Sequence, residues 1–444
     1  MSSIEDLDVL LLWDDTSGVA STVKSAVDAL VKHSKFRVLP IAVFGAFPEN
    51  LDLNRFDVIV IHYSLVLSVD AYVNAEAKRR LKNSSALKAI FIQDEYRFVC
   101  RSIEAMRDVG IKLLFTCVPD EEISKVYPDS SLPGVYKVNV LTGYVDESLL
   151  GRILPCYQGR KIDIGYRARK VPAWLGELGQ EKWNIGNRVR SDASRYGLIV
   201  DLAYREEERL YGEDWINFLS NCKATLGVES GASVFDFSGN LQSAVEKASS
   251  DNPDWSFSDL QKRYFAALEG QIRLNQISPR CFEAAALKTL MILYEGRYSD
   301  RLIPWRHYLP LKKDHSNFEE IVAILRDEER VNQIVNCAYQ EVAMNPHNSF
   351  LALTKIFDDA IIHCLGRDYI PVATGYSTEE FLAIERRHHR LRVGRNRFRM
   401  LLSWAYFFFF GKLLGPFSEE FRDKVQALLG KYLRPIFRKL LGRS

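Results

Sequence analysis

The chain opens with short apolar runs that alternate with amphipathic helical stretches. The stretches over about 20–33, 70–82 and 98–108 have helical periodicity, and strand-length runs surround them: DVLLLW (8–13), FRVLPIAV (36–43), FDVIVIHYS (56–64), LKAIFIQDE (87–95) and IKLLFTCV (111–118). Apolar strands separated by amphipathic helices predict a parallel sheet with helices on both faces. We therefore expect a first α/β domain over residues 1–155.

The same alternation resumes after residue 156 and predicts a second α/β domain over residues 156–347. Helices are expected near 179–188, 212–220 and along 318–342, and strands are expected in RKIDIGYRAR (160–169), GLIVDLA (197–203) and CKATLGVES (222–230). The segment 236–262 is polar and is interrupted by Asn-Pro and several serines, so we interpret it as an insertion loop. The stretch 348–366 is helical, and we expect it to pack back on the first domain within a crossing segment, 348–385.

One stretch of the second domain, ISPRCFEAAALKTLMILYEG (277–296), joins a helix directly to a strand. Ser278 is a good N-cap and Pro279 suits the first helical position. FEAAALK continues the helix, and TLMILYE is a buried strand ended by Gly296. A helix N-terminus has free N–H groups and a partial positive charge, and Arg280 adds a cation there. This stretch therefore has the features of a phosphate site, and the alternative is a helix that only packs on the sheet.

Charge is sorted along the chain. The whole sequence has a net charge of +2, but residues 386–444 contain 15 Lys+Arg against 3 Asp+Glu, which is +12, so the rest carries 2 − 12 = −10. The tail also holds an apolar run, LLSWAYFFFFGKLLGPF (401–417), and a basic amphipathic helix pattern over 425–444. Gly411 and Lys412 break the apolar run after roughly ten residues, whereas a spanning helix needs about 20.

Basic residues around an aromatic and apolar stripe are typical of a segment that lies in a membrane interface. We therefore expect the tail to bind an anionic membrane surface. The alternative is a pair of helices that binds a partner or caps a core. We do not expect a nucleic-acid partner, because Tyr406 and the run Phe407–Phe410 form one solid block, whereas stacking platforms interleave aromatic and basic residues.

Length, cysteines and absent motifs narrow the class of protein. A chain of 444 residues suits two domains with additions. Its seven cysteines are odd in number and scattered without a C-x-x-C pair, which argues against a disulfide framework or a zinc site and fits a reducing cytoplasm. The N-terminus has no signal-peptide pattern. The dinucleotide, P-loop, zinc-protease and G-x-S-x-G motifs are absent from the sequence.

The second half resembles GT-B glycosyltransferases, in particular the group-1 retaining family and the spore-maturation-protein-like family. SPRCFEAAALKTLMILYEG, the loop WRHYLPLKKD (305–314) and the long helix with AYQEV look like the C-terminal half of such enzymes, and KIDIGYRARKVPAWLGELGQEKWNIG (161–186) is similar to its start. The resemblance covers about 160–345. It implies two Rossmann-like domains facing each other across a cleft, with a nucleotide-sugar donor in the second.

The resemblance also implies roles for individual residues. Glu283 would accept hydrogen bonds from the ribose hydroxyls. Ser278, at the helix N-terminus, and Arg280 would face the pyrophosphate. Arg167 and Lys182 would neutralise the charge that grows as the sugar leaves, so that neither a metal nor a further cofactor is required. His307 would line the donor loop, with packing against Trp305 as the simpler interpretation.

The sequence departs from the retaining family at one catalytic position. The second glutamate of the family, eight residues before the one matched by Glu283, is Asn275 here. Glu229 in GVESGAS, followed by a glycine, is a candidate substitute. An inverting enzyme instead needs a base on the acceptor side, and His62 and the pair Asp94-Glu95 end strands of the first domain, where ligands of open α/β sheets bind.

The resemblance implies a glycosyltransferase that moves a sugar from a nucleotide-sugar to an acceptor hydroxyl. The tail motivates a role in cell-envelope or surface glycan synthesis, on a glycan or lipid-linked acceptor, at the cytoplasmic face of the membrane. One alternative is a nucleotide-sugar epimerase on the same fold. The other is a non-catalytic binding or assembly protein, which the asparagine at position 275 favours.

Overall fold

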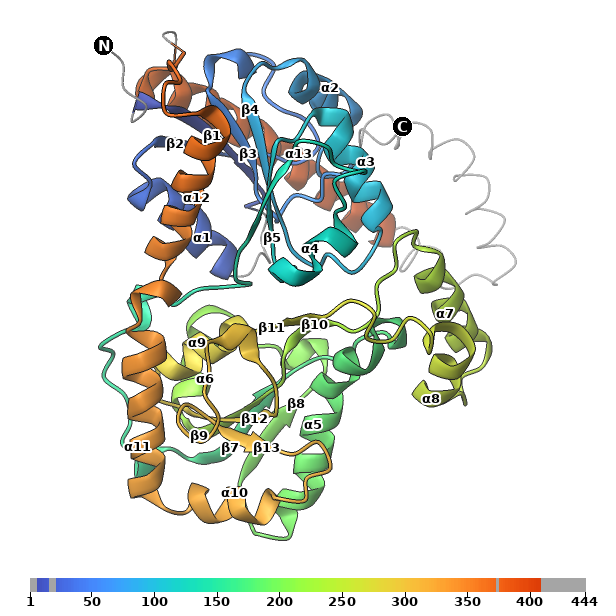
Figure 1. The fold of residues 1–444 in the computed structure, drawn as a ribbon, viewed down its shortest axis with the longest axis vertical. Helices are drawn as coiled ribbons and strands as arrows, with labels where there is room; N and C mark the ends of the chain where they lie inside the picture. Colours follow the sequence, from blue (N-terminus) through green and yellow to red (C-terminus); the bar gives the residue numbers. More distant parts are fainter. Residues whose placement is uncertain (1–5, 16–20, 373–374, 409–444) are drawn as a thin grey trace.

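Two parallel sheets, each flanked by helices, form the two halves of the molecule (Figure 1). The structure is a computed structural model that describes residues 6–15, 21–372 and 375–408. The first half, blue to teal, lies above the second half, green to orange, and the last helices return to the first half. This is the α/β architecture expected from the alternation of apolar runs and helical stretches.

The sheet of the first domain has six strands in the order β2-β1-β3-β4-β5-β6, all parallel. The strands are β1 (Asp8–Trp13), β2 (Arg37–Ala42), β3 (Val58–Ile61), β4 (Leu87–Ile92), β5 (Leu113–Thr116) and β6 (Tyr136–Asn139). Side chains of β1 alternate between two cores: Leu10 and Leu12 join one cluster, and Val9 and Leu11 join the other. The sheet is therefore buried on both faces, as its continuous apolar strands require.

Four helices connect these strands: α1 (Ser21–His33), α2 (Ala75–Asn83), α3 (Val99–Val109) and α4 (Asp120–Val126). The helix expected over 70–82 begins only at residue 75, because the Asn74 side chain caps it by accepting the N–H of Ala77. The strand β6 was not expected. Its sequence, YKVN, is partly polar and it lies at the edge of the sheet.

The second sheet has five parallel strands in the order β13-β12-β9-β7-β8. They are β7 (Ile162–Arg167), β8 (Val200–Ala203), β9 (Cys222–Gly227), β12 (Leu290–Tyr294) and β13 (Leu309–Leu311). The helices around them are α5 (Gly176–Ser194), α6 (Gly212–Ser220), α9 (Pro279–Ala286), α10 (Phe318–Leu325) and α11 (Glu328–Ala338). The chain order reverses between β7 and β9, which makes the carboxyl end of β7 a topological switch point.

The insertion-loop interpretation of 236–262 is wrong. This segment forms α7 (Asn240–Asp251) and α8 (Phe257–Leu260), framed by the short antiparallel pair β10 (Ser230–Ala232) and β11 (Leu274–Gln276). The polar residues that suggested a loop are helix boundaries: Asn252 ends α7, and Ser256 starts α8 with a capping box. Val245 and Ala248 pack into a separate small core with Trp174.

The long helical stretch 318–342 is also divided. Asp327 separates α10 from α11 because its side chain accepts the N–H of Arg330 and caps the second helix. The chain then crosses back to the first domain in α12 (Phe350–Leu365), as expected. Phe357 of α12 packs against Phe91 and Phe115, and the Ser34 hydroxyl donates to Asp358 at 2.6 Å.

The chain's basic segment begins within α13 (Thr378–Phe408), a helix whose first part packs on the first domain. Phe381 and Ile384 are buried in the core that also contains Leu10 and Leu12. Among the described residues, no helix has both the length and the apolar character needed to cross a bilayer. The break at Gly411 and Lys412 and the amphipathic pattern over 425–444 lie outside the described residues.

Candidate functional site

A cavity of about 640 Å³ lies between the two domains. The first domain contributes Thr22, Asp94 and Tyr96 to its wall, and the second domain contributes the carboxyl ends of β7 and β9 together with parts of α5, α6 and α9. Six residues singled out from the sequence line this one cavity: Asp94, Arg167, Lys182, Ser278, Arg280 and Glu283. Its position at the switch point is where open α/β sheets bind ligands.

Two arginines are held in place at the carboxyl end of β7. Arg167 makes a two-pronged ion pair with Asp201, with distances of 2.8 and 3.0 Å, and its guanidinium lies 4.0 Å from the centre of the Phe218 ring. Arg280 donates to the carbonyl oxygen of Arg167 and lies 5.0 Å from the Trp215 ring centre. Arg167 is therefore partly neutralised, while Arg280 keeps its positive charge without a carboxylate partner among the described residues.

Glu283 projects from the middle of α9, a helix whose apolar side is buried. The Trp215 indole N–H donates to its Oε2 at 2.8 Å, and burial raises the pKa of this carboxyl group. Within the described part of the chain, its Oε1 has no hydrogen bond, so this oxygen is available as an acceptor to a ligand in the cavity. Trp215 comes from α6, far from Glu283 in the sequence, and no sequence signal joined the two.

Lys182 on α5 brings a third cation to the cavity. Burial lowers the pKa of its ammonium to about 8, and Asp94, on the opposite domain, opposes that shift. Over the described residues, no hydrogen bond or ion pair to this ammonium is present. A desolvated lysine without a partner is poised to bind an anion, because an anionic group restores the interactions that the ammonium lost with water.

The N-terminus of α9 meets the first domain closely. A Cβ on Gly143 would lie 2.7 Å from Cγ of Pro279, so only glycine allows this approach. The neighbouring Thr142 hydroxyl donates to the carbonyl of Ile277 and so ties the two domains together. Ser278 has N-cap backbone angles, and its side chain makes no capping hydrogen bond in the described structure. Pro279 has no N–H and the Cys281 N–H donates to the Ser278 carbonyl at 2.9 Å, so the backbone N–H of Arg280 is the first-turn donor that remains available for an anion.

The loop between β4 and α3 crosses the cavity from the first domain and has a strained backbone. Asp94 and Phe98 both adopt positive φ, 56° and 51°. The Tyr96 hydroxyl donates to Asp94 Oδ1 at 3.0 Å, while the backbone of Tyr96 accepts the Asp236 N–H at 2.8 Å. The segment before α7 therefore holds this loop in place. Asp94 is the one of the two that lines the cavity, and an unusual backbone angle at such a position is typical of functional sites.

Glu229, the proposed substitute for the missing glutamate, turns its carboxylate away from the cavity. Val228 and Ser230 line the cavity, but the Glu229 carboxylate accepts the backbone N–H groups of Arg297 at 3.0 Å and Tyr298 at 2.8 Å. The structure therefore places this side chain in a turn that supports the site. The sequence showed its position at a strand end but not the direction of its carboxylate.

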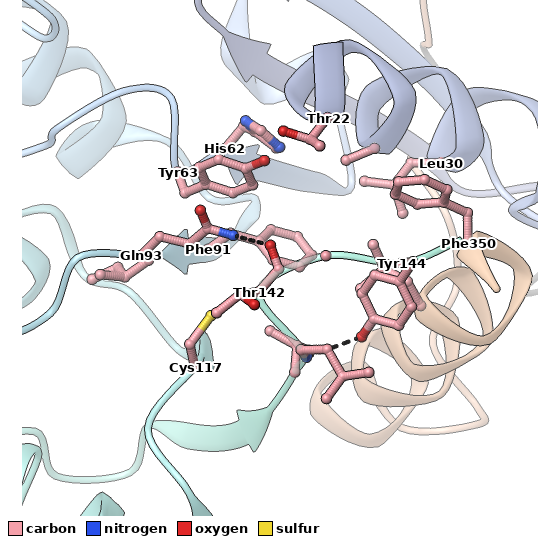
Figure 2. Close-up of a pocket in the computed structure, with 16 residues that line it drawn as sticks. Thr22, Leu30, His62, Tyr63, Phe91, Gln93, Cys117, Thr142, Tyr144 and Phe350 are labelled. Atoms are coloured by element: carbon pink, nitrogen blue, oxygen red, sulfur yellow. Dashed lines mark hydrogen bonds between the residues drawn. The ribbon is translucent and has the colours of Figure 1, made fainter. Parts of the chain in front are cut away.

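His62 lies in a second cavity of about 30 Å³, within the first domain, next to Tyr63 and Thr22 (Figure 2). Its Nδ1 accepts the Ser64 N–H at 3.2 Å, which leaves the proton of the neutral ring on Nε2, a buried atom with no partner in the described structure. Burial lowers the pKa of His62 to about 3. The cavity has room for one or two water molecules, and Thr22 borders both cavities.

Glu95 and His307 lie outside both cavities. The Glu95 carboxylate is buried and accepts hydrogen bonds from Thr116, Tyr127 and the Cys117 N–H, and burial raises its pKa to about 7. His307 is 4% exposed and pairs with Glu341 at 2.9 Å. Among the described residues, no cluster of three or more His, Cys, Asp or Glu side chains is arranged to hold a metal ion.

Comparison with known proteins places this geometry in a fold. No protein-family model matches the chain, and none of the curated proteins compared with it matches either. Among solved structures, an alpha-glucosyltransferase in complex with UDP and a 13-mer DNA containing an HMU base is similar over 80% of this chain and 99% of its own, with a TM-score of 0.52 and 10% identity.

Two further structures are more distant. HepE of Anabaena, in complex with UDP and glucose, covers 80% of this chain and 100% of its own with a TM-score of 0.42 and 8% identity. TarM covers 70% of this chain and 55% of its own with a TM-score of 0.39 and 10% identity. The likeness to the alpha-glucosyltransferase, together with the two parallel sheets, shows that this chain has the GT-B fold, with two Rossmann-like domains that face each other across a cleft, as the resemblance of the second half implied.

Proposed function

On the premise of the GT-B fold, we propose that the protein transfers a sugar from a nucleotide-sugar donor to an acceptor hydroxyl. One observation carries the proposal: a carboxylate with a free oxygen, a helix N-terminus and two unpaired cations converge on one interdomain cavity. Glu283 accepts from the ribose hydroxyls, and the first turn of α9 with Arg280 binds the diphosphate. The volume of the interdomain cavity, about 640 Å³, is within the range of small-molecule sites.

In this proposal the second domain stabilises the leaving diphosphate and the first domain supplies the base. Negative charge grows on the diphosphate as the bond to the sugar breaks, and the ammonium of Lys182 neutralises it together with Arg280, without a metal ion. Asp94, from the first domain, takes the proton of the acceptor hydroxyl if the reaction inverts the anomeric carbon. Its place in the same cavity as Lys182 supports this role.

The direct test is a thermal-shift screen against UDP-, GDP-, CMP- and dTDP-sugars. A donor at about 100 times its Kd stabilises the folded state by roughly 2.7 kcal/mol. One nucleotide class is expected to raise the Tm, and Glu283→Ala is expected to lose the shift. Glu295→Ala, an exposed acid after β12, is the matched control that keeps it. No shift with any of the four would contradict the donor site.

A second candidate, a non-catalytic binding or assembly protein, is favoured by Asn275, which stands where the retaining family has a glutamate. A product assay distinguishes this binding protein from a transferase and from an epimerase. A transferase releases the nucleoside diphosphate only when an acceptor is present, an epimerase converts the donor without any acceptor, and a binding protein gives a Tm shift with no turnover.

We further propose that the reaction takes place at the cytoplasmic face of the cell membrane, in cell-envelope or surface glycan synthesis. The charge of +12 over residues 386–444 supports attraction to anionic lipid. So does the attachment of α13 to the first domain, where Arg55 pairs with Glu380 at 3.3 Å. Deleting residues 386–444 should abolish binding to anionic vesicles. If the full-length protein does not bind them either, the membrane proposal fails.

A further inference from the structure

A row of cations leads from the interdomain cavity to its outer edge. Lys182 and Arg169 line the cavity, and Arg169 is near enough to lower the pKa of both Lys182 and Tyr96. Arg97, which belongs to the first domain, also lowers the pKa of Tyr96. Arg97 and Arg101 then flank one ring, with their guanidinium carbons 4.9 and 4.8 Å from the centre of Phe98.

These arginines have no acidic partners. Among the described residues, Arg97, Arg101 and Arg169 form no ion pair with an Asp or Glu side chain, although all three are exposed. Arg152, which is partly exposed, shows the contrast, because it pairs with Glu213 at 2.9 Å. The chain outside residues 386–444 carries a net −10, so an unpaired row is a local reversal of the surrounding charge. Two acids lie beside the row: Asp94, the candidate base, and Asp236, whose backbone bridges to Arg97 and whose carboxylate accepts the N–H groups of Gly239 and Gln242.

The aromatic rings along the row hold the arginines and leave little surface for other rings. Two guanidinium groups lie within 5 Å of the Phe98 ring centre, and Arg97 is also 6.0 Å from the ring centre of Trp174, a residue only 2% exposed. A guanidinium stacked on a ring keeps its N–H groups directed outward, in a geometry that suits phosphate oxygens. Recognition of single-stranded nucleic acid would instead need free aromatic faces for the bases.

We infer that the acceptor is a phosphate-bearing chain, a glycan or polyol whose units are joined by phosphodiesters. Its reacting hydroxyl lies at Asp94, and its flanking phosphates bind Arg169, Arg97 and Arg101. This inference rests on the proposed function, because it names the acceptor of the same site. The strained loop 93–98 positions Arg97 and Phe98, with Gly239 leaving the space that the Phe98 ring occupies: a Cβ there would lie 2.1 Å from that ring.

The test measures binding of a fluorescent poly(glycerol phosphate) oligomer by anisotropy, in saturating UDP, at low and moderate salt. The double variant Arg97→Gln/Arg101→Gln removes two exposed charges from the row. Arg107→Gln, an exposed arginine of the same helix α3, is the matched control. We expect wild type and control to bind, with an affinity that falls as salt rises, and the double variant to bind roughly tenfold more weakly.

Three results would overturn the inference. The double variant binds as well as wild type, or an uncharged dextran oligomer binds equally well at every salt concentration. In the third, a single-stranded oligonucleotide of equal charge binds tighter than the polyol phosphate and depends on the same arginines, which would assign the row to nucleic acid. The UDP thermal shift, measured on each protein, separates these results from failure of the donor site, since that shift does not involve Arg97 or Arg101.

Discussion

Asn275 donates a hydrogen bond from Nδ2 to Oε2 of Glu229 at a distance of 2.8 Å. The two residues meet because β10 and β11 pair antiparallel, with Gly231 opposite Asn275. A glutamate at position 275, as in the retaining family, would place a second carboxylate against Glu229, and like charges at that distance repel. The amide therefore fits the neighbour that this chain has, and the two positions act as a unit.

Replacing Asn275 by aspartate is expected to destabilise the protein. The Asn275→Asp change removes the donor and brings a like charge to a carboxylate that is only 7% exposed. We expect the free energy of unfolding to fall by about 2 kcal/mol in urea titration. Adding Glu229→Gln should recover part of that loss, because the new amide donates to the new acid. An unchanged midpoint in the single variant would contradict this pairing.

Lys182 makes nucleotide binding depend on pH. Its pKa is about 8 in the free protein, and a bound phosphate raises it, so affinity should weaken as pH rises from 8 toward 9.5. Calorimetric titration with the nucleotide at pH 7, 8 and 9 measures this. Lys182→Arg keeps its charge over the whole range and should give a flatter profile. A profile equally steep in both proteins would assign the dependence to another group.

Lys182 should also affect stability, with the opposite sign to a paired lysine. Because its pKa is lower in the folded state than its usual 10.5, the unfolded chain binds more protons between pH 8 and 10.5, and stability rises with pH in that window. Lys182→Met removes the desolvated charge. We expect it to have a higher Tm at pH 7 than wild type while losing the nucleotide-induced shift. A lower Tm would show that the ammonium stabilises the free protein.

Asp94→Asn tests the acceptor base with little change in structure. Asparagine tolerates positive φ, so the backbone at 56° is preserved. We expect turnover to fall by about 10²- to 10⁴-fold, the usual contribution of a general base, while the Tm shift with the nucleotide is kept. Tyr96→Phe, which removes the hydroxyl that contacts Asp94, should lower turnover less. Full activity of Asp94→Asn would exclude the base role.

His62 is expected to act as a neutral, buried group. Its pKa is about 3 in the folded protein against 6.5 normally, so the unfolded chain binds the extra proton between these values and stability falls as pH drops below 6.5. One such proton contributes about 1.4 kcal/mol per pH unit. His62→Gln should therefore show a shallower loss of Tm from pH 6.5 to 4.5. Equal slopes would place the protonation elsewhere.

Local patterns in the sequence determined most of the fold. Apolar runs of strand length and helical periodicity depend on nearest neighbours, so β1, β3, β4, β9 and the Ser278-Pro279 start of α9 were predictable. Strands with a weak sequence pattern were not predicted. β6 (YKVN) and β13 (LPL) are short edge strands, and a proline is tolerated at an edge because no further strand needs its N–H. The interpretation of 236–262 as an insertion loop was wrong because the residue types that cap helices are also typical of loops.

Tertiary structure alone decided which side chains share the site. Glu229 and Asp94 both follow strands in the sequence, yet a turn at Arg297 and Tyr298 takes up the first carboxylate, and only the second enters the cavity. Trp215 and Arg169 line the cavity from separate elements of the second domain, and Asp94 meets them from the first domain because of how the two domains pack. Spacing along the chain holds no such information, because side-chain direction depends on contacts between residues far apart in sequence.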